Sequence, residues 1–232
     1  MELHRRHMML YALMLLALTG MRAPSEIFSL SWGDIAYRRK KYDDRNAMMQ
    51  PMNIIDNAFM LEASLDDGLR LTTHKIFDEW MCNDMGEVDI SIISIPENTK
   101  TGSRNVPCLC SGLFQQIKDY YHFMEVEVDG KFIIPPFDKD QPIFLELFGR
   151  CKGKVFEKHA FNRLFRELMA RVGLERIKFT PYHFRHFFIT QRIKAGAKVP
   201  MIAKLVGNSP TEIYRTYEHV ILEDDLESLL QV

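Results

Sequence analysis

The chain has 232 residues, of which 47% are apolar and 26% charged, and this composition excludes disordered and fibrous proteins. The formal net charge is −1, so the total charge gives no sign of a polyanionic partner. The total hides a basic block from Arg150 to Lys204, with 14 Lys and Arg against 3 acids. It also hides an acidic tail from Gly207 to Val232, with 1 Arg against 6 acids.

Two features of the sequence bear on the cell compartment. The four cysteines form neither a pair of C-x-x-C motifs nor a regular framework, which favours reduced thiols in a cytosolic protein without zinc. Arg5 and Arg6 precede the apolar run Met8–Leu18 and imitate a secretory signal. At about 11 residues the run is too short to span a bilayer, and no small-x-small cleavage site follows it. We expect a buried helix there. The alternative, a secreted protein, would require this segment to be missing from the mature chain.

In chain order, the run Met8–Leu18 predicts a fully buried helix that ends at Gly20. A second helix is expected to begin near Pro24. Its inward face would carry Ile27, Leu30 and Trp32. The stretch 36–85 mixes charge clusters with short apolar pieces, so an insertion and irregular hairpins are both compatible with it.

The middle of the chain predicts strands. Val88–Pro96 is β-branched and alternating, and Asn105–Leu109 is a second short run, so the two predict a β-hairpin whose turn carries Lys100. A helix is expected over Ser111–Val126. A connection that contains prolines follows over Gly130–Pro142.

The last third predicts helices separated by glycine stops. The expected helical segments are Phe156–Val172, Pro181–Ala195 and Val199–Val206. Thr211–Tyr217 is expected to be a short helix or turn, and Leu222–Leu230 a small amphipathic helix. The predicted fold is mainly α-helical with a small antiparallel β-sheet.

Three basic residues stand in segments that are otherwise apolar or tightly turned: Arg22, Lys100 and Arg185. A buried arginine requires a partner. Glu26 could pair with Arg22 in a structural salt bridge, and a lone hairpin lysine is usually solvated. Arg185 has no acid within a helical turn, so a structural role alone explains it less well.

Together the three fit a phosphate ligand. Two guanidinium groups can hold the non-bridging oxygens of a phosphodiester and neutralise the charge that builds up at phosphorus. A lysine on a hairpin can protonate the leaving 5′ oxygen. A tyrosine suits the role of nucleophile, because its phenolate both attacks and leaves well.

Three stretches resemble signatures of one family. LALTGMRAPSEIFSLSWGDI at Leu16–Ile35 is similar to the first signature of tyrosine recombinases, in which T-G-x-R precedes an E and an L-x-W-x-D-I segment. TKTG at Thr99–Gly102, followed by RNVP, resembles the family's hairpin with its lysine. PYHFRHFFITQRIKAGAKVPMIAKLVGNSPTEIYRTYEH at Pro181–His219 resembles the second signature, H-x-x-R-H, then L-G-H-S, then Y. On these stretches the chain is identified as a member of the tyrosine recombinase, or phage integrase, family.

The resemblance implies roles for single residues. Arg22 and Arg185 would clamp the phosphate, Lys100 would be the general acid and Tyr217 the nucleophile. Tyr214 lies three residues earlier, but counting from the L-G-H-S turn selects Tyr217. Glu26 would be a supporting residue that holds Arg22.

Two positions depart from the family pattern. The H-x-x-R histidine falls on Tyr182 and the L-G-H-S histidine on Asn208. Both can donate a hydrogen bond to a phosphate oxygen, but a phenol with a pKa near 10 is a poor proton acceptor at neutral pH. The proton of Tyr217 would then be taken by water, by His183 or by His186. We treat the two histidines as supporting residues.

The resemblance also implies the partners. No metal or cofactor is expected, the substrate is double-stranded DNA, and four protomers would exchange strands on it. The basic block Arg150–Lys204 would follow the DNA backbone. The tail 221–232 could dock on a neighbouring protomer or on its own chain.

Residues 1–232 are expected to form a single catalytic domain in the cytoplasm, not in a membrane. The N-terminal DNA-clamping module is expected to be absent, as in a fragment of a longer integrase that binds DNA weakly and is compatible with a monomer. Two alternatives stay open: a type IB topoisomerase-like enzyme that relaxes supercoils, and a non-catalytic DNA-binding relative.

Overall fold

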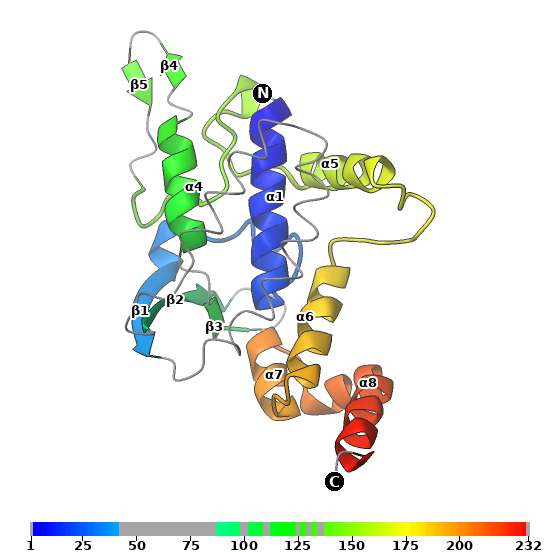
Figure 1. Cartoon of the computed structure of the whole chain (residues 1–232). Helices are drawn as coiled ribbons and strands as arrows, with labels where there is room; N and C mark the ends of the chain where they lie inside the picture. Colours follow the sequence, from blue (N-terminus) through cyan, green and yellow to red (C-terminus); the bar gives the residue numbers. More distant parts are fainter. Residues whose placement is uncertain are drawn as a thin grey trace.

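The computed structural model describes residues 2–41, 87–97, 102–108, 112–123, 126–128, 131–133 and 137–230. In these residues helices pack around a three-stranded antiparallel sheet of order β1-β2-β3, with a separate two-stranded ribbon β4-β5 (Figure 1). The predicted class, mainly helical with a small antiparallel sheet, is confirmed.

Helix α1 (Glu2–Thr19) runs through the centre of the molecule (Figure 1). Its side chains from Met8 to Leu18 are all buried, which is why nearly every position of this stretch is apolar. The helix ends before Gly20, whose φ of 64° is a left-handed conformation that glycine adopts without steric cost. The predicted stop is confirmed, and the helix begins earlier than the apolar run.

The second helix that we expected near Pro24 does not form. Residues 23–29 make hydrogen-bonded turns, and only Trp32–Asp34 forms a short 3₁₀ helix, η1. The carbonyl of Leu30 and the N–H of Trp32 pair with the backbone of residues 141–143, at 3.0 Å each. Because tertiary pairing takes up these groups, they are not available to a helix. Burial of Ile27, Leu30 and Trp32 is nevertheless as predicted.

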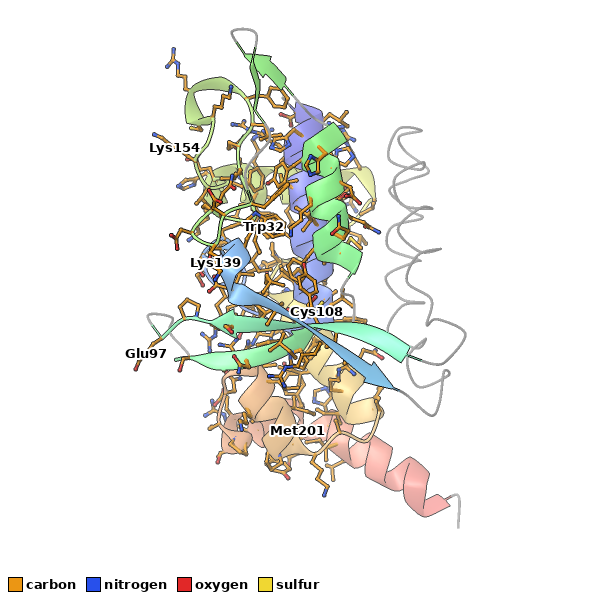
Figure 2. The ribbon with its side chains drawn as sticks, turned by 90° about the vertical axis from the view of Figure 1, so that its left-hand side faces the viewer. Trp32, Glu97, Cys108, Lys139, Lys154 and Met201 are labelled. Carbon is orange, nitrogen blue, oxygen red and sulfur yellow. The ribbon has the colours of Figure 1, made fainter. Side chains whose placement is uncertain are left out.

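The sheet contains the predicted hairpin and one further strand. Strand β1 (Ile35–Lys41) pairs antiparallel with β2 (Glu87–Ile95), and β2 pairs antiparallel with β3 (Arg104–Cys108). Figure 2 shows the sheet crossing the molecule between α1 and α4 on one side and α7 on the other. The predicted hairpin strands are therefore present, whereas Lys100 and residues 42–86 lie outside the described residues.

One hydrophobic core surrounds α1. Helix α4 (Gly112–Phe123), the buried segment 143–147 and helix α5 (Lys158–Arg171) pack against it together with the sheet. The helices expected near Ser111–Val126 and Phe156–Val172 are thus confirmed. The predicted connection 130–142 also contains a strand, β5 (Lys131–Ile133). It pairs with β4 (Val126–Val128), which precedes the connection. A short 3₁₀ helix, η2 (Gly149–Cys151), precedes α5.

A second core lies between the last three helices. They are α6 (His183–Lys194), α7 (Val199–Val206) and α8 (Pro210–Leu230), and they gather near the C-terminal end of α1 (Figure 1). The bounds of α7 are those expected. Two separate pieces were expected where α8 stands, and α8 is indeed interrupted: Tyr217 has non-helical φ and ψ of −118° and 18°.

The two cores meet where α1 contacts α6. A Cβ atom built on Gly20 would lie 2.4 Å from Cδ1 of Phe188 in α6, closer than real atoms approach. Gly20 is therefore required by both its backbone conformation and its packing. Among the described residues that were singled out from the sequence, Arg22, Arg185 and Tyr217 lie around this seam.

Candidate active site

Arg185 is the centre of the site and is 1% exposed. Its guanidinium group donates to the carbonyl of Gly20 at 2.7 Å, to the carbonyl of Val206 at 2.5 Å and to Oδ1 of Asn208 at 3.0 Å. Gly20 and Val206 stand at the C-terminal ends of α1 and α7, where unpaired carbonyls favour a cation. The hydrogen bonds of this buried charge therefore go to carbonyls at helix ends and to an amide oxygen, while Glu26 acts on it only through its charge.

Burial and the nearby positive charge of Arg22 lower the pKa of Arg185 to about 10. The group stays protonated at neutral pH. It therefore provides a permanent positive charge inside the protein, fixed between two helix ends, and this charge favours binding of an anion.

Arg22 follows the end of α1 and points to the same acceptor. Its NH2 donates to Oδ1 of Asn208 at 3.3 Å, so one amide oxygen receives hydrogen bonds from two guanidinium groups. The Nε atoms of Arg22 and Arg185 are buried and have no acceptor among the described residues. Two like charges converge on a single point, and this arrangement favours an anion there.

Glu26 connects the backbone of Arg22 to strand β3. Its carboxylate accepts the backbone N–H of Arg22 at 2.8 Å and forms a salt bridge with Arg104 of β3, with N–O distances of 2.7 and 3.1 Å. Arg104 also donates through Nε to the carbonyl of Leu205 at 2.8 Å. The pair that was considered from the sequence, Glu26 with the side chain of Arg22, is thus replaced by a contact to the Arg22 backbone.

Arg104 is a site residue that sequence reasoning missed. It closes the hairpin motif after TKTG, but nothing in its neighbourhood along the chain announces Glu26, which is 78 positions away. The available signal was Glu26 itself, because a buried carboxylate requires a basic partner. Three arginines and one carboxylate, Arg22, Arg104, Arg185 and Glu26, leave the seam with an excess of positive charge.

Tyr217 lies in the break of α8 and is 5% exposed. Its hydroxyl is hydrogen-bonded to Nδ1 of His186 at 2.7 Å. Burial, and to a lesser extent nearby Tyr182, raise the pKa of Tyr217 to about 12 against the opposing effect of Arg185. Tyr214, by contrast, is 51% exposed on the same helix.

The remaining predicted residues divide between the site and its edge. Tyr182 is half exposed at the start of α6, with its ring 5.1 Å from that of His186. His183 uses Nδ1 toward Thr180, 3.0 Å from both the backbone N and the hydroxyl. The structure thus brings together Arg22, Arg185, Asn208, Tyr217, His186 and Tyr182, while His183 bonds to the loop before α6 and Lys100 lies outside the described residues.

The comparisons with known proteins show the family and the fold of the chain. The model of the phage integrase family matches residues 41–223, more than half of the chain. The match begins after the T-G-x-R segment and includes Arg185 and Tyr217. No curated protein matches the chain.

A solved structure described as "Crystal structure of XerA recombinase" has 16% sequence identity and a TM-score of 0.50. The superposition covers 99% of this chain and 60% of that one, so the chain spans about three fifths of its length. In the described residues no helix is both long and apolar enough to cross a membrane. On the family match, the chain belongs to the phage integrase family of tyrosine recombinases.

Proposed function

We propose that this chain cleaves and rejoins DNA at specific sites through a 3′-phosphotyrosine intermediate, in DNA integration and recombination. The observation that supports this most is the convergence of Arg22 and Arg185 on one acceptor atom, Oδ1 of Asn208. A non-bridging phosphate oxygen would meet the same two donors. Tyr217 lies close enough to Arg185 for the positive charge to lower the pKa of the phenol.

In the proposed reaction the oxygen of Tyr217 attacks phosphorus and the bond from phosphorus to the 5′ oxygen breaks. Arg22 and Arg185 stabilise the extra negative charge on the non-bridging oxygens. Lys100 protonates the leaving 5′ oxygen, and Tyr182 and the amide of Asn208 donate further hydrogen bonds. A 5′ hydroxyl from another strand reverses these steps.

The proposed partner is double-stranded DNA, with four protomers around two duplexes, no metal or cofactor, and a cytoplasmic location. The exposed part of the basic block Arg150–Lys204 would contact phosphates on either side of the cut. These contacts carry no sequence information, so the target sequence depends on other contacts.

The first prediction concerns the covalent intermediate. A pool of duplexes with randomised sequence and a nick that releases the 5′ end is incubated with the protein, and adducts that survive denaturation are captured and sequenced. We expect an adduct with the native chain, and its loss in Tyr217→Phe, because phenylalanine lacks the attacking oxygen.

Tyr214→Phe is the matched control, since Tyr214 is exposed on the same helix, and it should still form the adduct. Absence of any adduct with the native chain would favour the non-catalytic DNA-binding alternative. Relaxation of supercoiled plasmid without transfer to a second duplex would favour the topoisomerase alternative.

A further inference from the structure

The hydroxyl of Tyr217 and the imidazole of His186 form a contact between two helices. His186 follows Arg185 in α6, Tyr217 lies at the break of α8, and Nδ1 is 2.7 Å from the phenol oxygen. This is the distance at which a proton can pass from one group to the other. The contact therefore joins the proposed nucleophile to a side chain that can hold a proton.

Other polar residues at the site are poorly suited to take that proton. Tyr182 is itself a phenol, which accepts protons poorly at neutral pH. An amide such as that of Asn208 does not act as a base, and its oxygen already accepts from two arginines. His183 directs Nδ1 to Thr180. Among the described residues, His186 is the base whose bond to Tyr217 is in place.

The charges around His186 keep its lone pair available. Burial lowers the pKa of His186, and the electrostatic effects of His183 and Arg185 act in the same direction. The group is therefore neutral at pH 7. Tyr217, with its pKa raised to about 12, is protonated and needs an acceptor before it can attack. The groups that face this pair are His183, Arg185 and Tyr182.

We propose that His186 is the general base that takes the proton of Tyr217 during DNA cleavage. This rests on the proposed function above. As the bond from the Tyr217 oxygen to phosphorus forms, the phenol proton moves to Nδ1 of His186, while the bond to the 5′ oxygen breaks and that oxygen is protonated by the general acid. In the rejoining step His186 returns the proton to Tyr217. The histidine replaces the proton acceptor that Tyr182 and Asn208 do not supply.

The contact also has a structural interpretation, in which the hydrogen bond merely holds Tyr217 in the core of α6, α7 and α8. His186→Asn separates the two roles. Asparagine can place an amide oxygen near the position of Nδ1 and accept the hydrogen bond, but it does not accept the proton. A structural role predicts little loss in this variant, whereas a base predicts a large one.

The test uses the duplex captured with the native chain and measures single-turnover adduct formation. We expect His186→Asn to slow it by roughly 10²–10⁴-fold, the usual contribution of general base catalysis. His122→Asn is the matched control, because His122 is exposed at the far end of α4 and should leave the rate unchanged. Thermal unfolding of each variant shows whether its fold is intact. If His186→Asn is unfolded, His186→Ala supplies the same comparison, with added imidazole expected to restore part of the rate.

The pH profile gives a second readout. In the native chain the rate should fall as pH drops through the pKa of His186, which lies below the ordinary 6.5, because the protonated imidazole accepts no proton. In His186→Asn this acidic limb should be absent. A native acidic limb that persists unchanged in the variant would overturn the proposal.

A duplex whose 5′ bridging oxygen is replaced by sulfur tells a base from an acid. A thiolate leaves without protonation, so loss of the general acid no longer slows cleavage, while loss of the base still does. We expect the His186→Asn defect to persist with this duplex and a Lys100→Ala defect to disappear.

A His186→Asn defect that disappears would show that His186 acts on the leaving group. An equal or faster native-duplex rate in His186→Asn would also overturn the proposal, whereas no adduct with the native chain would overturn the proposed function itself.

Discussion

Asn208 occupies a position between two cations. Its Oδ1 accepts from Arg22 at 3.3 Å and from Arg185 at 3.0 Å, so the neutral amide separates charges that otherwise repel each other. A neutral residue here leaves the positive charge of the two arginines uncompensated, and under the proposed function a DNA phosphate would compensate it. The side chain at position 208 therefore affects both the stability of the protein and its affinity for a phosphate.

Asn208→Asp should change these two properties in opposite directions. A carboxylate between two guanidinium groups makes charge-assisted hydrogen bonds, so the free energy of unfolding should rise by about 1 kcal/mol at pH 7. The same negative charge repels a phosphate, and adduct formation should fall by roughly 100-fold or more. Denaturant unfolding and single-turnover cleavage measure the two effects.

The sign of the pH dependence follows from the new carboxyl group. The arginines lower its folded pKa below the unfolded value of about 3.9, so the added stability is present above that value and is lost as pH falls through the folded pKa. Asn208→Ala is the control, since it removes the oxygen without adding charge. The explanation fails if the aspartate variant is less stable than the alanine variant at pH 7.

At the scale of elements, the junction of α1 with α6 depends on a glycine. Gly20→Ala should lower the free energy of unfolding by roughly 2–4 kcal/mol, from a left-handed φ of 64° and a Cβ 2.4 Å from Phe188. Because Arg185 donates to the Gly20 carbonyl, cleavage should fall with stability.

Gly196→Ala is matched to this change. Gly196 has a φ of 71°, but a Cβ there would meet nothing within 4 Å, so only the backbone cost of about 1 kcal/mol remains. Equilibrium unfolding of the two variants separates the effect of conformation from that of packing. Equal losses of unfolding free energy in the two variants would show that Phe188 moves away from the new Cβ atom without a cost in stability.

The sequence predicted these elements where local signals were strong. Val199–Val206 is bounded by a proline near its start and a glycine after its end, and α7 has those bounds. The segment after Pro24 carried helix-start signals, but the Leu30 carbonyl and the Trp32 N–H pair with residues 141–143. No local pattern reports a partner more than 100 residues away.

The site divides in the same way. Arg22, Arg185 and Tyr217 stand in motifs with fixed spacing, so their meeting could be expected from the resemblance. The partners of these residues could not. Tyr217 is hydrogen-bonded to His186, whereas His183, one turn earlier on the same side of α6, is hydrogen-bonded to Thr180. The pairing of Arg104 with Glu26 depends on the sheet lying against the turn.

At the scale of the whole molecule, the proposed function requires that the charge asymmetry of the sequence act on DNA. Two exposed lysines, Lys198 just before α7 and Lys204 within it, belong to the basic block. Changing both to glutamine should weaken binding to a random duplex several-fold and flatten the dependence of log affinity on log salt by about one unit per lysine.

Lys139→Gln is the control, because Lys139 is exposed beside η1, outside the block (Figure 2). Titrations at several salt concentrations measure the slopes. An unchanged slope in the α7 variant, or an equal change in Lys139→Gln, would remove α7 from the DNA-binding face.

The seam between the two cores also has a consequence during synthesis on the ribosome. Along the chain Arg22 comes first, Arg185 and His186 follow, and Tyr217 comes after them. Arg22 and Arg185 can share the Asn208 acceptor only after α7 and Asn208 have been translated, and Tyr217, the proposed nucleophile, is translated later still. Under the proposed function, a nascent polypeptide, or one terminated before Tyr217, lacks the attacking oxygen and is unable to cut DNA.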